Sequence, residues 1–156
     1  MKKRALPLVA LFLALLLLFG GCAAFSHYED TNGDQDYTLQ TLTDENIMKG
    51  TGGSLSSVSL RTSSITPSKS KVTLKVGKFS GVSTLESFRG GSSYRTVTVS
   101  LTVSAGNFKA VLCTDSEILY VFPINQTGSS YSFKKEQTVY LRIAGESAKY
   151  ELTYEY

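Results

Sequence analysis

The sequence predicts an all-β domain over residues 55–156, an antiparallel β-sandwich or jelly roll of about eight strands. Apolar and polar residues alternate with a period of two along most of this stretch, which is typical of strands that bury one face. Turn-forming residues recur at short intervals, and no segment in the stretch has the apolar spacing of an amphipathic helix.

The first predicted strands alternate clearly. Val58 and Leu60 stand between polar neighbours, and the next strand has the inward residues Val72, Leu74 and Val76. The clearest strand runs from Tyr94 to Val103, and one of its faces consists of Val97, Val99, Leu101 and Val103. We expect these apolar faces to meet in a common core.

Two further strands are predicted on either side of a polar hairpin turn at residues 114–117. The first covers residues 108–113 and ends at Cys113, which we expect to be a small buried hydrophobe. The second covers residues 118–122, which are apolar on both faces and therefore predict a central strand covered on each side. Pro123 ends it, because proline cannot donate a hydrogen bond to the ladder.

Three strands complete the predicted domain. A short one at residues 131–133 follows a polar turn at residues 126–129. The inward residues are Val139, Leu141 and Ile143 on the next strand, and Tyr150, Leu152, Tyr154 and Tyr156 on the last. Residues 138–145, together with residues 150–152, resemble the closing strand pair of secreted bacterial β-sandwiches of the pre-peptidase C-terminal type. This resemblance covers roughly 20 residues and implies a fold rather than a function.

The first 21 residues have the pattern of a secretory signal. Lys2, Lys3 and Arg4 precede an apolar run of about 15 residues, whereas a permanent membrane span needs about 20. The run leads into Phe19-Gly20-Gly21-Cys22, which resembles the bacterial lipobox, with Phe19 in place of the usual leucine. An ordinary secretory signal, cut near Ala23 or Ala24 with loss of Cys22, is the alternative.

The lipobox resemblance implies a bacterial lipoprotein that is cleaved before Cys22 and carries a lipid, such as palmitate, on that thiol. We therefore expect three parts: a signal peptide at 1–21, a lipidated cysteine with a flexible tether at 22–54, and the β-sandwich at 55–156. The expected location is the cell membrane or the outer membrane, facing outside the cytoplasm. Turn and linker composition at residues 31–34 and 50–54 predicts the tether, with one strand inside it at residues 37–42.

Few residues indicate chemistry. Cleavage would leave 13 basic and 13 acidic residues, a balance that predicts no nucleic-acid partner. Residues 30–34 resemble the start of a calcium loop, but Gln35 and Thr41 stand where such a loop needs a glycine and a glutamate. We therefore expect no metal and no cofactor.

Catalysis has weak support in the sequence. The one histidine, His27, precedes the predicted domain, and no nucleophile motif is visible. Asp115 and Glu117 lie in one turn, as a glycosidase pair does, although two acids in a hairpin are more often solvated. We expect a protein that is not an enzyme; a small lipid-anchored hydrolase acting on an envelope or environmental polymer is the alternative.

Tyr140 and Arg142 are the candidate binding residues, because they lie on the face of their strand opposite Leu141. An outward tyrosine beside an arginine can stack on a sugar ring or grip an extended peptide. The alternative is that Tyr140 packs beneath a neighbouring loop. The predicted function is a membrane-anchored, ligand- or partner-binding β-sandwich. Its expected partners are the membrane, through the lipid on Cys22, and a glycan, a cell-wall component or an envelope protein.

Overall fold

The computed structural model describes residues 39–66, 69–134 and 136–156, which form an antiparallel sheet of six strands. The strand order is β1-β2-β6-β3-β4, and β5 pairs with β3. The elements are α2 (Asp44–Lys49), β1 (Ser54–Thr66), β2 (Lys69–Phe88), β3 (Arg95–Cys113), β4 (Ile118–Phe122), β5 (Gln126–Phe133) and β6 (Val139–Glu155). The all-β antiparallel prediction is therefore confirmed.

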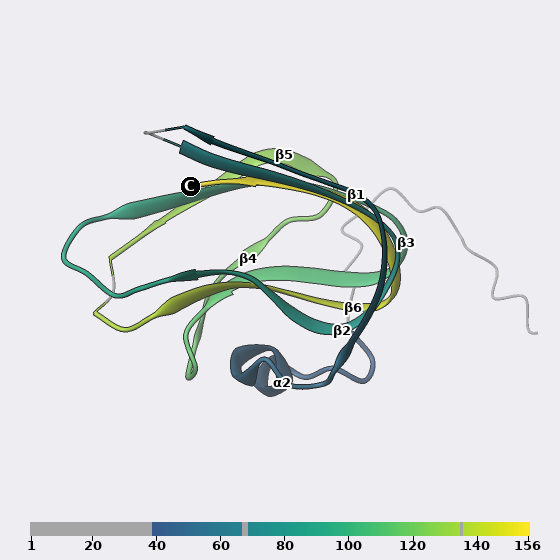
Figure 1. Cartoon of the computed structure of the whole chain (residues 1–156). Helices are drawn as coiled ribbons and strands as arrows, with labels where there is room; N and C mark the ends of the chain where they lie inside the picture. Colours follow the sequence, from purple (N-terminus) through teal and green to yellow (C-terminus); the bar gives the residue numbers. More distant parts are fainter. Residues whose placement is uncertain (1–38, 67–68, 135) are drawn as a thin grey trace, which may run out of the picture. The chain divides into compact units, whose positions relative to one another are not determined.

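The three longest strands, β2, β3 and β6, bend sharply and fold the sheet over itself into two layers, a β-sandwich (Figure 1). Register shifts mark the bends, in β2 between Val76 and Gly81 and in β3 between Val103 and Asn107. We call the layer that contains β1 and β5 the upper layer, and the layer that contains β4 the lower layer. Each long strand contributes one half to each layer.

These bends explain why six strands replace the predicted eight. Residues 95–113 form one strand where two were predicted, and residues 139–155 do the same. Alternation is lost at each bend because the bulged residues leave the pleat, and a sequence pattern cannot distinguish that interruption from the end of a strand.

The main core lies between the layers. The inward residues predicted for the strands at 94–103, 139–143 and 150–154 are all buried there, as are Val72, Leu74 and Val76. β1 is the exception, since all 13 of its residues are exposed, including Val58 and Leu60. The core prediction is wrong for both residues. No described strand of the lower layer lies opposite Val58, and a register shift after Val58 places Leu60 on the outer face, opposite Lys75.

The lower layer is covered on both faces. Its outer face carries a second, smaller core, in which Ile47 of α2 packs with Val82, Val111, Cys113 and Ala144. Cys113 is a free, fully buried thiol, as predicted, and burial raises its pKa.

The strand covered on both sides is not the one predicted. β4 lies at the edge of the lower layer, and Val121 is 44% exposed. The lower halves of β3 and β6 are buried on both faces instead, at residues 110–113 and 141–144. An apolar run identifies a buried segment, but strand order decides which run becomes central.

Residues 39–53 do not form a free tether, and this corrects the domain boundary predicted at residue 55. They belong to the same compact unit as the sheet, and they contain α2. Of the strand predicted at residues 37–42, residues 39–42 are not in a strand and the first two lie outside the described residues. A helix of six residues is too short to be stable alone. Thr43 and Asn46 form a capping box at its start, Gly50 ends it with a φ of 65°, and Ile47 is fully buried.

The signal pattern, Cys22, His27 and the calcium-loop resemblance at residues 30–34 lie outside the described residues. Within the described part of the chain, no helix has the length and apolar character needed to span a membrane.

Candidate functional site

Tyr140 and Arg142 lie on the predicted face of β6, opposite the main core, but α2 covers this face. Arg142 is only 6% exposed, and Tyr140 is half-buried. The prediction of an outward recognition face is therefore wrong for Arg142. The reason is that residues assigned to the tether fold back and cover the lower layer.

Arg142 binds the C-terminal end of α2. Its Nη1 donates to the carbonyl of Ile47 at 3.0 Å and also to the carbonyl of Met48. Its Nε donates to Thr84 Oγ1 at 3.1 Å, and its guanidinium lies 4.0 Å from the centre of the Tyr140 ring. A positive charge is favourable at a helix C-terminus, where the last carbonyls lack the usual intrahelical partners. The Ile47 carbonyl also accepts from Gly50 N at 3.0 Å. Arg142 therefore attaches the helix to the sheet and offers little to a ligand.

The two acids of the hydrolase alternative lie in the turn between β3 and β4. Thr114 organises this turn: its Oγ1 accepts hydrogen bonds from the N–H groups of Ser116 and Glu117. The Asp115 side chain is 74% exposed and lies 3.7 Å from Arg142 Nη2. Neither acid lines either of the two cavities described below. Among the described residues, no three His, Cys, Asp or Glu side chains are grouped closely enough to hold a metal ion.

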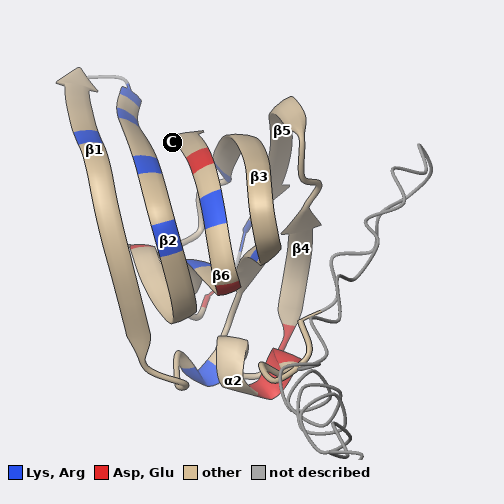
Figure 2. Cartoon of the chain, turned by 90° about the vertical axis from the view of Figure 1, so that its right-hand side faces the viewer, with Lys and Arg blue, Asp and Glu red and all other residues tan. Residues whose placement is uncertain are grey.

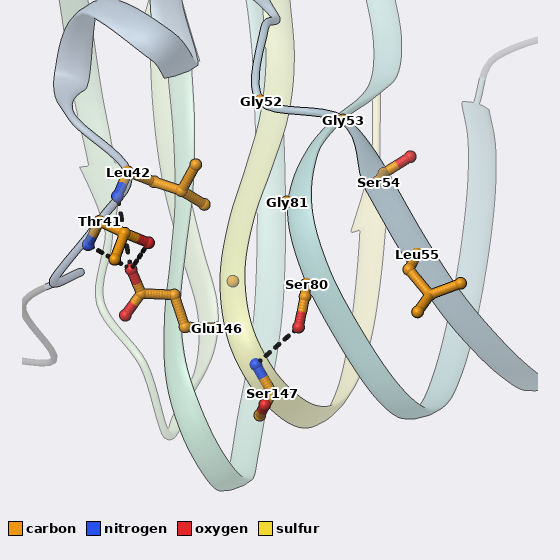
Figure 3. Close-up of a pocket in the computed structure, with 11 residues that line it drawn as sticks. Thr41, Leu42, Gly52, Gly53, Ser54, Leu55, Ser80, Gly81, Glu146 and Ser147 are labelled. Atoms are coloured by element: carbon orange, nitrogen blue, oxygen red, sulfur yellow. Dashed lines mark hydrogen bonds between the residues drawn. The ribbon is translucent and has the colours of Figure 1, made fainter.

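A shallow hollow of about 530 Å³ lies at the bend, between residues 41–42, the glycines 52–53 and the start of β1 (Figure 3). Glu146 is its charged residue. Glu146 Oε1 accepts from the N–H and Oγ1 of Thr41 at 2.6 and 2.8 Å, and Oε2 accepts from Gln40 N and Asn107 Nδ2.

Partial desolvation opposes ionisation of Glu146, but these hydrogen bonds outweigh it and lower the pKa of the carboxyl to about 2. Both carboxylate oxygens are already engaged by the protein's own groups. In this hollow Glu146 therefore attaches residues 40–42 to β6, and its carboxylate is not free to bind a ligand.

A second cavity, of about 210 Å³, opens between the two layers beneath β1, and we call it the interlayer cleft. β1 contributes Ser56, Val58 and Arg61, and the lower half of β2 contributes residues 83–85. The interior wall consists of core side chains, among them Val72, Leu74, Val76, Phe79, Tyr150 and Tyr154. This opening exists because β1 extends the upper layer and no described strand lies opposite it in the lower layer.

Arg61 and Tyr154 line the interlayer cleft, and Glu86 and Tyr156 are close enough to Tyr154 to influence its charge. Tyr156 Oη donates to Glu86 Oε2 at 2.7 Å, and Tyr154 Oη donates to the Leu85 carbonyl at 3.4 Å. Burial raises the pKa of Tyr154 to about 12; the Glu86 carboxylate adds to this rise, and the Arg61 guanidinium opposes it. No hydrogen bond or ion pair joins Arg61 to another residue in the described part of the chain.

Two lysines of β2 differ from Arg61 because they form ion pairs. Figure 2 shows the basic positions of β1 and β2 as bands on neighbouring strands. Lys71 forms an ion pair with Glu155 at 2.8 Å, and Lys75 lies 3.6 Å from Glu151, so acids of β6 pair with these two lysines. Arg61 is on the opposite face of the sheet, because it pairs in register with the buried Leu74.

No protein-family model, curated protein or solved structure matches this chain. The resemblance to pre-peptidase C-terminal domains stays a prediction. The interlayer cleft was missed by sequence reasoning, since Val58 has the same alternation as a core residue. The one signal for it was Arg61, a charged residue that follows an alternating apolar pair.

Proposed function

We propose that this protein is a membrane-anchored, extracytoplasmic lipoprotein whose β-sandwich is a non-enzymatic binding module. In this proposal Cys22 carries the lipid, and the interlayer cleft replaces Tyr140 and Arg142 as the binding site.

The anchoring part is supported by Phe19-Gly20-Gly21-Cys22 after a basic start and an apolar run. The small residues Gly20 and Gly21 suit cleavage before Cys22. The remaining cysteine, Cys113, is fully buried between α2 and the sheet, which makes it a poor substrate for acylation.

The binding part is supported by one observation, the interlayer cleft itself. Apolar side chains of the core are reachable from solvent there, beside Arg61, which has no ion pair with a described residue. Exposed apolar surface bordered by polar groups is typical of interaction sites. The neighbouring edge strand adds Leu55, Val58 and Ile65, which are 72%, 52% and 81% exposed.

Metabolic labelling with an alkyne palmitate analogue tests the anchor. Wild-type protein and the Cys113→Ala control should both incorporate the label and fractionate with membranes. Cys22→Ala should incorporate none. Equal labelling of Cys22→Ala and wild type would overturn the lipoprotein assignment.

A further inference from the structure

The interlayer cleft has the features of a site that lacks one strand. In the lower layer β2 continues past Gly81 to Phe88, whereas its pairing with β1 ends at Gly81, opposite Ser54. The backbone of Gly53 then accepts a hydrogen bond from Val82 N, and no described strand pairs with this side of β2 at residues 83–88. An added strand at this edge would lie beneath β1 and would cover Val58 and Arg61.

The volume of the cleft favours inserted side chains over a whole small molecule. Pockets that enclose drug-sized ligands have volumes of about 300–1,000 Å³. The interlayer cleft has about 210 Å³, lined largely by valine, leucine and aromatic side chains. An extended polypeptide needs only to place alternate side chains into such a space, because its backbone binds the free strand edge.

Charge selects among extended polypeptides. Arg61 is the only charged residue in β1, so a second copy that offered its own β1 would bring a second positive charge to the first. Glu86, the acid near Tyr154, already accepts a hydrogen bond from Tyr156, whereas Arg61 lines the cleft and has no ion pair with a described residue. The complementary occupant therefore carries a carboxylate.

We propose that the interlayer cleft binds an extended, acidic segment of a partner polypeptide. The segment pairs with β2 at residues 83–88, inserts apolar side chains beside Val58 and Tyr154, and places a carboxylate at Arg61. This inference rests on the proposed binding function and names its ligand class.

Two pairs of matched variants test the site. Val58 and Leu60 are 52% and 47% exposed on the same strand, but Val58 lines the cleft and Leu60 lies on the other face, opposite Lys75. Val58→Asp is therefore compared with Leu60→Asp, and Arg61→Glu with Arg95→Glu, because Arg95 is exposed on β3 and does not line the cleft.

The probe is a displayed library of random linear peptides, selected against the full chain in detergent. We expect enrichment of peptides with alternating apolar residues and at least one Asp or Glu. Fluorescence anisotropy of an enriched peptide should give a Kd at least about tenfold weaker for Val58→Asp and Arg61→Glu, and changed less than about twofold for the two controls.

Several outcomes would overturn the proposal. Equal weakening by Val58→Asp and Leu60→Asp would place the peptide on the outer edge of β1 rather than in the cleft. If the chain sediments as a dimer, and the two cleft variants Val58→Asp and Arg61→Glu dissociate it, the occupant of the cleft is a second copy. Binding of dodecanoate, but of no peptide, with the same dependence on Val58 would leave the binding module intact and refute only the peptide. Failure of peptides and dodecanoate alike would refute the binding function as well, while the lipid anchor is tested separately.

Discussion

Replacing Arg142 by Met should detach α2 from the sheet while the sandwich stays folded. Methionine retains much of the apolar stem and removes the guanidinium, so the carbonyls of Ile47 and Met48 lose the arginine donor, and the Ile47 carbonyl keeps only Gly50 N. Charge-assisted hydrogen bonds contribute roughly 1.5–3 kcal/mol each, whereas the pair with the exposed Asp115 contributes little. We expect a loss of about 3–4 kcal/mol in the free energy of unfolding. Undocking of α2 limits the loss, because it returns the two carbonyls to water.

Urea unfolding gives the global value, and amide hydrogen exchange gives the local one. The Ile47 N–H, which donates to the Thr43 carbonyl, should exchange much faster in Arg142→Met, while amides of β3 and β6 keep most of their protection. Arg95→Met is the matched control at an exposed arginine and should change stability by less than about 0.5 kcal/mol. The reasoning fails if Arg142→Met costs under about 1 kcal/mol and Ile47 stays protected.

Three further predictions concern the carboxylate at the bend, the core and the glycines. The folded-state pKa of Glu146 is about 2, below the ordinary 4.5, so the stabilising contribution of this carboxylate is present above about pH 4.5 and is lost as pH falls toward 2. Glu146→Gln should remove this part of the acid dependence of stability, as measured by urea melts at a series of pH values. Identical pH profiles for the variant and the wild type would contradict this prediction. Leu141→Ala should lower the free energy of unfolding by about 2–5 kcal/mol and Leu60→Ala by under about 1 kcal/mol, since Leu141 is fully buried and Leu60 is 47% exposed. A reversed order in urea melts would mean that the strand faces are misassigned. At Gly81 an added Cβ would overlap the Gly53 carbonyl oxygen, whereas at Gly53 it meets nothing within 4 Å. Thermal melts should therefore show Gly81→Ala as the more damaging by several degrees, and equal shifts would refute the close approach.

Strand periodicity determined most of the fold by itself. Alternation at residues 97–103, 139–143 and 150–154 identified the inward residues correctly, because a strand of period two has one core face whatever its neighbours are. The buried state of Cys113 was also predictable from its apolar run. The lipobox pattern is equally local, and its consequence stays a prediction.

Tertiary structure decided what each face meets. Val58 and Leu141 have the same local pattern, yet one is half exposed and the other fully buried, since β1 extends past the lower layer and β6 lies in the middle of the sheet. Arg142 was correctly assigned to the face opposite the core. Its burial depends on a six-residue helix whose stability comes from the sheet that it covers, and no local pattern specifies such a contact. The interlayer cleft also depends on tertiary structure. The strand order leaves a strand missing in the lower layer, and the bends bring residues 58–61 and 83–85 together.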